Sequence, residues 1–477
     1  MKPGEIKITA HQWQQLESAL LSRTDVETKA FVFAQSVQLD SRTQFLVREV
    51  VEVPADAYES RSAAQVVIRE EYVARMLQHS YRHGLSLVDV HTHPWSERPT
   101  FSSIDDRTDQ KRYSYTAEKM AAHGFRDFRH ASVVFGLEMS FDGRYWEPAS
   151  CEIQRIERLR VIGLPLTQKC ATNADPSGLP SSSKAIYDRQ IRAFGDAGQS
   201  LLQGMAVAIV GLGGMGSQIA QALALLGVGK LILIDPDEVE LSNANRLVGV
   251  FAEHFAHRSS KVAAISETLS RLPRPPEITI RAAPVSDPGV FPLLAEADVI
   301  VGAVDSPGAR MYVNQVAAAL LVPYLDAGVG IKADSGRATD GGGQVQVIVP
   351  GATPCLACIG QLAAQVVQEE LFPEQRELWR SRGYIEGEDV KAPQVVFLNG
   401  VVANLLINEF VKLATGVATT VPYLYYDLLA RHQPIVAHAV ALPPRRADCI
   451  VCSFDGLLAR GPGALDVTAD ACEMAST

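Results

Sequence analysis

The sequence predicts an α/β protein with two domains, and three observations carry this prediction. After residue 185, short apolar segments such as AVAIVGLGGMG, KLILIDPD and ADVIVGAVDS alternate with helical stretches, which is typical of a mostly parallel sheet with helices on both faces. Residues 1–165 have a different, mixed pattern of strand-like and helix-like segments. Residues 166–184, between them, are rich in Ser, Pro, Gly and Asn, the composition of a linker.

Composition narrows the class of protein. The chain has 477 residues, of which 47% are apolar and 21% charged, as in an average soluble protein and unlike disordered, collagenous or coiled-coil chains. With 44 basic and 54 acidic residues the net charge is −10, which argues against nucleic acid as a partner and against anionic membranes. No uninterrupted apolar run approaches the ~20 residues of a membrane span, and the N-terminus lacks a signal-peptide core. We expect a cytoplasmic protein.

Within residues 1–165, periodicity predicts individual elements. EVVEVP and SLVDVHT alternate as strands do, whereas QWQQLESALL and IREEYVARMLQHSYRHG carry helical spacing. The second of these strands leads into VDVHTHPWSERPTFSSIDD, which places His91 and His93 two residues apart. A period of two puts both imidazoles on one face of the strand.

Two histidines followed by a carboxylate form a pattern of zinc ligands. His91, His93 and Asp105 supply three protein ligands and leave a fourth position for water, as in catalytic zinc sites. Zinc lowers the pKa of such a water to about 7. Each piece alone is common, because Ser102-x-x-Asp105 is also a capping box at a helix start.

Together, H-x-H-P and S-x-x-D resemble the JAMM (MPN-plus) metallopeptidase family, which cleaves ubiquitin and ubiquitin-like proteins from their targets. The resemblance implies a JAMM-type α/β domain in which His91, His93 and Asp105 bind zinc and Ser102 hydrogen-bonds the tetrahedral intermediate. The register Ser103/Asp106 lengthens the loop further and fits less well. The family's general base is an early glutamate. Glu27 fits best by position, and Glu49 and Glu52 are its rivals.

A second group of residues indicates a nucleotide-binding site. A glycine-rich turn follows a predicted strand and begins a helix, and its glycines are Gly211, Gly213, Gly214 and Gly216. Glycines there permit close approach of backbone N–H groups to phosphate. Asp235 ends the next strand, where an acidic side chain binds ribose. G-x-G-x-x-G alone is a weak signal whose default meaning is NAD binding.

The residues that follow favour a different family. The pattern D-x-D-x-V-x-x-S-N-x-x-R is formed by Asp235, Asp237, Val239, Ser242, Asn243 and Arg246. The chain also contains Tyr187-Asp-Arg189-Gln190, Lys261, Asp305, Arg310, Asn314 and DAGVG. Together these motifs resemble the ThiF/MoeB/HesA and ubiquitin-activating-enzyme family. The resemblance implies a Rossmann-like adenylyltransferase over residues 185–477. Asp235 then binds ribose, Asn243, Arg246 and Lys261 hold the phosphates of ATP, and Asp305 binds Mg²⁺. Arg189 reaches into the partner's site in a homodimer.

Seven cysteines, an odd number, argue against a disulfide framework in this chain. Four of them form two C-x-x-C pairs, Cys355/Cys358 and Cys449/Cys452, and four thiolates make a closed, structural zinc site. No cysteine lies between Cys358 and Cys449, where activating enzymes usually carry the thiol that forms a thioester. Cys170 and Cys472, of which we prefer Cys472, are the alternatives.

These features predict an enzyme that adenylates the C-terminal glycine of a Gly-Gly-ended ubiquitin-like protein and carries a zinc peptidase for the same partner. We expect a bacterial conjugation system in which the adenylate passes directly to an external thiol, on a conjugating enzyme or on a sulfur donor. Two alternatives stay open. The product is a thiocarboxylate for biosynthesis, or the first domain only docks the partner.

Overall fold

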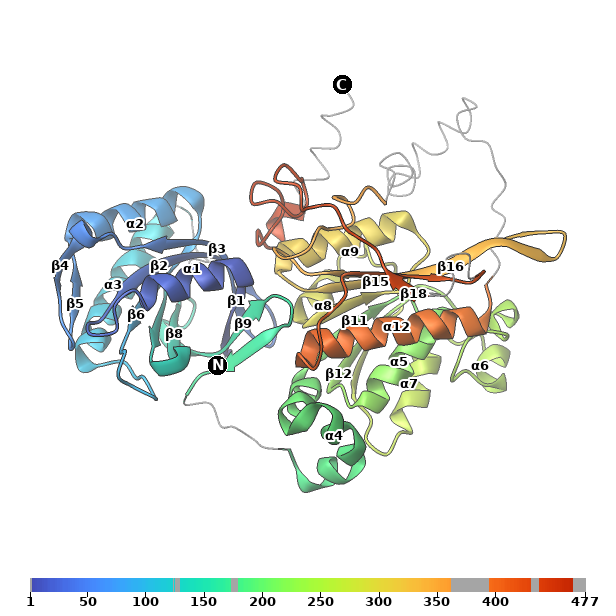
Figure 1. Ribbon diagram of the computed structural model, residues 1–477. Coiled ribbons are helices and arrows are strands. Elements are labelled where there is room, and N and C mark those ends of the chain that lie inside the picture. The colour runs from blue at the N-terminus through green and yellow to red at the C-terminus, as the bar shows by residue number, and fades with distance from the viewer. Residues whose placement is uncertain are drawn as a thin grey trace. The chain divides into compact units, whose positions relative to one another are not determined.

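The computed structural model describes residues 2–122, 124, 129–172, 179–361, 394–429 and 437–465 (Figure 1). The chain divides into two compact units. The first comprises residues 1–177 with the segments 319–321 and 457–477, and the second comprises residues 178–318 and 322–456. Both units are mixed α/β, as the sequence predicts.

An eight-stranded sheet that closes on itself forms the first unit. Its order is β1-β3-β2-β6-β7-β8-β9-β10, and β1 also pairs with β9, in parallel. The strands are β1 (Gly4–Thr9), β2 (Lys29–Gln38), β3 (Thr43–Glu52), β6 (Ser86–Thr92), β7 (Ala131–Phe135), β8 (Phe141–Glu147), β9 (Glu152–Ile162) and β10 (Thr167–Cys170). The strand predicted for SLVDVHT is therefore confirmed as β6, and the sheet leaves few free edges.

Helices and a small hairpin surround this sheet. They are α1 (Ala10–Leu20), α2 (Glu70–His83), α3 (Ser103–Ala122), the 3-10 helices η1 (Ala55–Ala57) and η2 (Leu137–Met139), and the hairpin strands β4 (Tyr58–Arg61) and β5 (Val66–Ile68). Helix α1 begins with a capping box, in which the Gln12 N–H donates to Thr9 Oγ1 and the Thr9 N–H donates to Gln12 Oε1. Helix α2 ends at Gly84 in the left-handed region. Both helices were predicted from their spacing.

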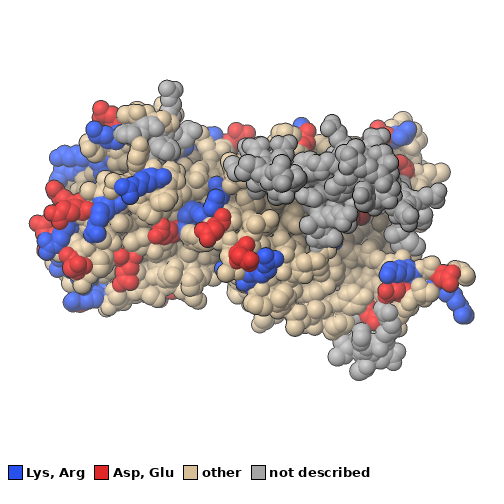
Figure 2. Space-filling model, turned by 90° about the horizontal axis from the view of Figure 1, so that it is seen from above, with Lys and Arg blue, Asp and Glu red and all other residues tan. Residues whose placement is uncertain are grey.

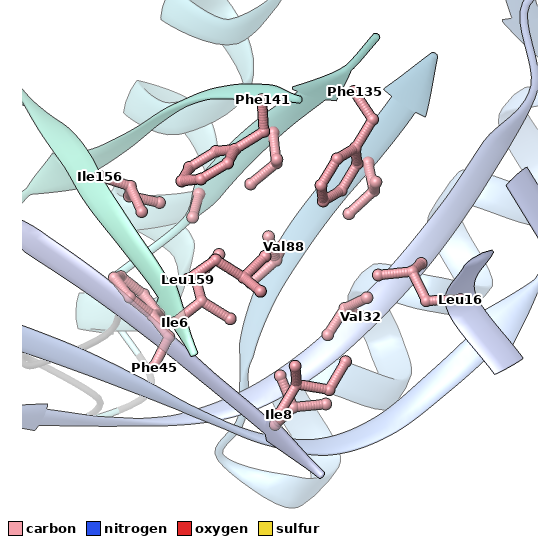
Figure 3. Packing of buried hydrophobic residues seen from close by; sticks show 14 of the residues in the cluster. Ile6, Ile8, Leu16, Val32, Phe45, Val88, Phe135, Phe141, Ile156 and Leu159 are labelled. Atoms are coloured by element: carbon pink, nitrogen blue, oxygen red, sulfur yellow. The ribbon is translucent and has the colours of Figure 1, made fainter. Parts of the chain in front are cut away.

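The core of the first unit lies inside the curved sheet. Figure 3 shows the apolar side chains that meet there, from the strands and from α1. The labelled residues are Ile6, Ile8, Leu16, Val32, Phe45, Val88, Phe135, Phe141, Ile156 and Leu159. On β2, Val32 faces this core, whereas Phe31 and Phe33 face a second cluster with α2. Strands β2 and β6 are thus buried on both faces, which fixes them firmly.

The second unit contains a sheet that is half parallel and half antiparallel. Its order is β13-β12-β11-β14-β15-β16-β17-β18, parallel as far as β15 and antiparallel beyond it. The strands are β11 (Ala206–Val210), β12 (Lys230–Ile234), β13 (Glu277–Arg281), β14 (Val299–Gly302), β15 (Tyr324–Asp334), β16 (Arg337–Ile348), β17 (Tyr423–Asp427) and β18 (Ala437–Ala439). The direction changes at Ser335-Gly336, a two-residue turn in which both residues have positive φ.

Helices cover both faces of the second sheet. Figure 1 shows α5, α7 and α12 on one face and α9 on the other. The helices of this unit are α4 (Ser181–Gly204), α5 (Gly214–Leu226), η3 (Leu241–Asn243), α6 (Ala252–Ala256), α7 (Lys261–Ser270), α8 (Phe291–Glu296), α9 (Pro307–Leu320) and α12 (Val396–Thr415). This arrangement is the one expected for residues 185–477, except for the antiparallel half.

Among the described residues, α12 is the one helix whose length and composition would let it cross a membrane, and half of its most apolar window is buried within the protein. It packs against α5, β15 and β16, as a core helix does. The sequence argument missed α12 because its polar residues interrupt the apolar run.

The range expected to be a linker, 166–184, differs from the structure at both ends. Residues Thr167–Cys170 form β10, which pairs antiparallel with β9, and α4 begins at Ser181. A four-residue, exposed edge strand carries no hydrophobic alternation, so composition alone could not distinguish it from a linker.

Charged side chains of both signs are interspersed on the first unit. Figure 2 shows lysines and arginines beside aspartates and glutamates over the face of this unit that it presents. Neighbouring charges of opposite sign largely cancel beyond a Debye length of about 10 Å. That face therefore presents a mixed surface rather than one large field of a single sign.

Candidate functional sites

The two predicted histidine ligands lie at the carboxyl end of β6. His91 is buried within the strand and His93 follows it, and their ring centroids are 5.1 Å apart. The His93 N–H donates to the carbonyl of Phe135 (2.7 Å), which fixes the backbone just beyond the strand. Burial, and then the charge of Lys29, lower the pKa of His91 to about 4. The ring is therefore neutral at pH 7, the form that binds a metal.

The predicted carboxylate ligand comes from the first turn of α3. The Ser102 N–H donates to Asp105 Oδ2 (2.7 Å) and the Asp105 N–H donates to Ser102 Oγ (3.2 Å). This reciprocal cap orients the carboxylate so that Asp105 Oδ1 lies 3.7 Å from His91 Nε2. In the alternative register, Asp106 instead pairs with Arg144 (2.6 Å). The capping box and the metal-ligand geometry therefore coexist in one motif.

The donor set of this cluster fits a zinc ion. One ligand atom from each of His91, His93 and Asp105 lies within 4.8 Å of the others. Among the described residues, His91 Nε2 is buried yet makes no hydrogen bond, which is costly unless a ligand occupies that position. Two imidazole nitrogens and one carboxylate are the usual three ligands of catalytic zinc.

Of the three candidate bases, only Glu27 lies at this cluster. Its Oε1 is 3.5 Å from His93 Nε2, and burial together with Asp105 raises the pKa of Glu27 to about 7. Glu49 pairs with His79 (2.9 Å) on α2, and Glu52 is exposed at the end of β3. Position along the sequence favoured Glu27 without excluding the other two, and of the three it is Glu27 that lies next to His93.

A cavity of about 510 Å³ surrounds the cluster. Glu27, His91, His93, Ser102 and Asp105 all line it. Trp95 lines it too, 51% exposed and stacked on His93 with an interplanar angle of 11°. Sequence reasoning passed over Trp95, although its place directly after H-x-H-P was a signal. The cluster therefore lies at the wall of a cavity and not within the packed core.

In the second unit, the glycine-rich turn that joins β11 to α5 is closely packed against its neighbours. Gly211 has φ +89°, and a Cβ on Gly211 would lie 2.6 Å from the Ala303 carbonyl oxygen. A Cβ on Gly216 would lie 1.9 Å from the Gly211 carbonyl oxygen, whereas one on Gly213 meets nothing within 4 Å. Gly211 and Gly216 therefore allow close packing, and Gly213 leaves the N-terminus of α5 open.

Asp235 lies just beyond β12 and contacts this turn. The Leu212 N–H donates to Asp235 Oδ2 (2.6 Å) and the Asp237 N–H donates to Oδ1 (2.9 Å). Burial raises the pKa of Asp235. Lys261 Nζ lies 3.5 Å from Asp235 Oδ1 and 2.6 Å from Asp237 Oδ2. Asp237, which sequence reasoning gave no role, holds the predicted phosphate-binding lysine beside the glycine turn.

The other predicted nucleotide-binding residues lie near the same edge. The aliphatic part of the Arg246 side chain packs against Gly214 of α5, since a Cβ on Gly214 would lie 3.2 Å from it. Buried Asn243 accepts a hydrogen bond from the Glu240 N–H (3.1 Å). Asp305 is exposed in the turn between β14 and α9. The carboxyl ends of β11 and β14, where the strand order reverses, are where ligands bind in open parallel sheets.

Arg189 is placed apart from these residues. Its neighbours anchor α4, because Gln190 Nε2 donates to the Leu226 carbonyl (3.3 Å) and Tyr187 packs against Gly227. The Arg189 side chain is exposed. Its predicted role across a dimer stays a prediction.

Two further residues of the predicted family pattern have structural contacts. Arg310 on α9 forms a two-point ion pair with buried Asp326 of β15, and the Tyr324 hydroxyl donates to the same carboxylate (2.6 Å). Asn314 Oδ1 accepts a hydrogen bond from the Leu356 N–H (3.1 Å). These contacts attach α9 to the sheet and to the first cysteine pair.

The two cysteine pairs converge on one buried cluster. Cys355 Sγ lies 3.7 Å from Cys449 Sγ, and Cys358 Sγ lies 3.3 Å from Cys452 Sγ. Sulfurs about 2.3 Å from a tetrahedral zinc are separated by about 3.8 Å. The neighbouring thiol of Cys449 raises the pKa of Cys355, and four thiolates at these distances would repel one another unless a cation lay between them. The cluster fits a structural zinc ion, as the sequence predicts.

Comparison with known proteins agrees with the second unit's architecture. The model of the ThiF family matches residues 187–451. The chain belongs to the ThiF family. A ubiquitin-like modifier-activating enzyme 5 from Oryza sativa subsp. japonica is 32% identical over 244 residues, covering 48% of this chain and 52% of the relative. The same-named enzyme of Gallus gallus is 30% identical over 245 residues, covering 48% and 56%. This ThiF-family chain spans about half the length of these curated relatives.

Solved structures with partial similarity include E. coli MccB with ATP and selenomethionine-labelled PaaA. The TM-scores are 0.44 and 0.43, with 22% and 21% sequence identity. MccB is covered to 74% and PaaA to 86%, and each match covers 56% of this chain.

Gly216→Ala should destabilise the protein, because the new Cβ requires the Gly211 backbone to shift. We expect a loss of about 2–3 kcal/mol in the free energy of unfolding, measured by urea denaturation. Gly213→Ala is the matched control and should change stability by less than about 0.5 kcal/mol. Equal losses for the two variants would contradict this account of the turn.

Cys449→Ser should remove one zinc ion per chain, because it breaks the four-sulfur cluster. Binding energy of a structural zinc is folding energy, so the free energy of unfolding should fall by more than about 3 kcal/mol. Elemental analysis and denaturation measure the two effects. Cys170→Ser, at an exposed thiol, should change neither, and full zinc content in Cys449→Ser would refute the cluster as a metal site.

Proposed function

We propose that this chain adenylates the C-terminal glycine of a Gly-Gly-ended ubiquitin-like protein with ATP, and that its first unit is a zinc peptidase acting on the same protein. The ThiF family membership and the activating-enzyme relatives support the first activity. The observation that carries the second is the convergence of Glu27, His91, His93 and Asp105 on one cavity. A bacterial conjugation system is the setting we propose.

In adenylation, a carboxylate oxygen of the substrate attacks the α-phosphorus of ATP, and the bond to pyrophosphate breaks. The N–H groups at the start of α5 face the phosphates, because Gly213 leaves that end open. Arg246 and Lys261 neutralise negative charge as it moves onto pyrophosphate, with Asn243 beside them. Asp235 holds the ribose, and Asp305 is the ligand for Mg²⁺. Arg189 of a second copy completes the site in a homodimer.

In the peptidase, the chain's own groups move the proton and hold the oxyanion. When bound, zinc makes a hydroxide available near neutral pH. Glu27 accepts the proton from the attacking water and passes it to the leaving amine. Ser102 Oγ accepts from the Asp105 N–H, so its own hydroxyl proton is free to stabilise the tetrahedral oxyanion.

Two alternatives use the same fold. In the first, the adenylate becomes a thiocarboxylate for biosynthesis. In the second, the first unit only docks the partner, and the buried, unbonded His91 Nε2 argues against that reading. We propose direct transfer of the adenylate to an external thiol, on a conjugating enzyme or a sulfur donor. Cys170 is exposed on the first unit, and Cys472 lies outside the described residues.

Asp305→Ala should lower ATP–pyrophosphate exchange by at least about 100-fold, because it removes the ligand for the charge-neutralising metal. The assay contains the chain, ATP, labelled pyrophosphate and a Gly-Gly-ended ubiquitin-like protein. Glu277→Ala is the control, since Glu277 is exposed at the amino end of β13, away from the strand ends that form the site. Exchange at the normal rate by the Asp305→Ala variant would show that Asp305 is not the Mg²⁺ ligand.

A mixture of Arg189→Ala and Asp305→Ala chains tests whether a homodimer shares its sites. Heterodimers contain one site with both residues intact, so part of the exchange activity should return on mixing. If Arg189→Ala alone keeps full exchange, Arg189 has no role in trans.

Glu27→Gln should abolish cleavage of a ubiquitin-like fusion while the chain retains two zinc ions, because Glu27 handles the proton and is not a metal ligand. Elemental analysis and a gel-based cleavage assay measure the two properties. The matched control is Glu49→Gln, which should keep both. His91→Ala with His93→Ala should lose one zinc ion, and unchanged zinc content there would exclude the peptidase.

A further inference from the structure

A carboxylate that no step of the proposed chemistry uses lies beside the histidine cluster and lines the same cavity. Asp89 is on β6, two residues before His91, and its side chain is 4% exposed. Lys29 Nζ contacts Asp89 Oδ1 at 2.7 Å, and Arg112 Nη1 contacts Asp89 Oδ2. Both cations are themselves largely buried. One carboxylate therefore bridges two largely buried cations at the wall of this cavity, and such charge-assisted contacts fix the geometry of the three groups.

The three residues come from the three elements that carry the site. Lys29 begins β2, two residues after Glu27. Asp89 shares β6 and one face of it with His91. Arg112 lies on α3 seven residues after Asp105, two helical turns along, so both residues are on the same side of the helix. The ion pairs thus connect the base, the first histidine and the carboxylate ligand.

Helix α3 depends on polar contacts for its position. Among the residues of this helix that the structure describes, Asp109 and Tyr113 are buried. Asp109 pairs with Arg144 of β8 (2.7 Å), and the Tyr113 hydroxyl donates to Ser132 Oγ of β7 (2.7 Å). Because little apolar surface holds this helix, the Arg112–Asp89 pair has a large share in setting its distance from β6.

We propose that Asp89 is a positioning residue for the metal site. By holding Lys29 and Arg112 together, it sets the spacing of Glu27, His91 and Asp105 and so makes the metal affinity high. This role rests on the proposed peptidase function. Partners that orient metal ligands from behind typically change affinity by about 10–100-fold when lost.

The test is the zinc affinity of the histidine site in the full chain, measured by competition with a chromophoric chelator after the four-cysteine site is loaded. Asp89→Asn should weaken zinc binding by about 10–100-fold and leave the four-cysteine zinc in place. Glu147→Gln is the matched control. It breaks the buried two-point pair of Glu147 with Arg129 (3.0 Å), also in the first unit, and should destabilise the fold without changing zinc affinity.

The outcomes separate the two proposals. Wild-type protein without a second zinc site overturns both the peptidase and the positioning role. Normal zinc affinity in Asp89→Asn, or an equal loss in Glu147→Gln, overturns the positioning role alone. Should Asp89→Asn fail to fold, Lys29→Gln removes only one of the two ion pairs, and a loss of at least about 5-fold in affinity is then expected. Unchanged affinity in a folded Lys29→Gln chain also refutes the proposal.

Discussion

Both candidate sites depend on strands that are buried on both faces. Such a strand exposes little of its surface, so charged groups within it must be paired, as Asp89 is on β6. Reactive polar groups appear where the strand ends: His91 and His93 at β6, Gly211 after β11 and Asp305 after β14. Because backbone hydrogen bonds hold these strands in register on each side, their ends are fixed points from which short turns place side chains accurately.

The sequence was sufficient to predict clusters whose residues lie close together along the chain. It was insufficient where the pairing of distant strands brings residues together. His91, His93 and Asp105 lie within one short segment, and the two C-x-x-C pairs carry their own spacing, so the two possible metal clusters could be predicted. Position favoured Glu27 but could not exclude Glu49 and Glu52, because which glutamate meets His93 depends on the pairing of β2 with β6. The pairing of β1 with β9 closes the first sheet across about 150 residues and leaves no local pattern.

Polar residues of a family pattern also serve several purposes that the pattern does not reveal. Lys261 is held by Asp235 and Asp237, so the proposed phosphate binding would exchange one set of charge partners for another. Arg310 is committed to Asp326 inside the fold. A charged residue of the family pattern can therefore bind a ligand or form a structural ion pair, and only its three-dimensional neighbours distinguish the two.

The four-cysteine cluster makes the chain between its two pairs a loop tied at both ends. That stretch, 359–448, contains α12, β17 and β18, which are themselves packed into the unit. Closing a flexible loop twice as long costs only about 0.6 kcal/mol more. A change in the length of this stretch should therefore cost little in closure entropy, provided that the cluster still holds its two ends. The cluster thus makes the stability of this part of the second unit depend only weakly on how much chain it encloses.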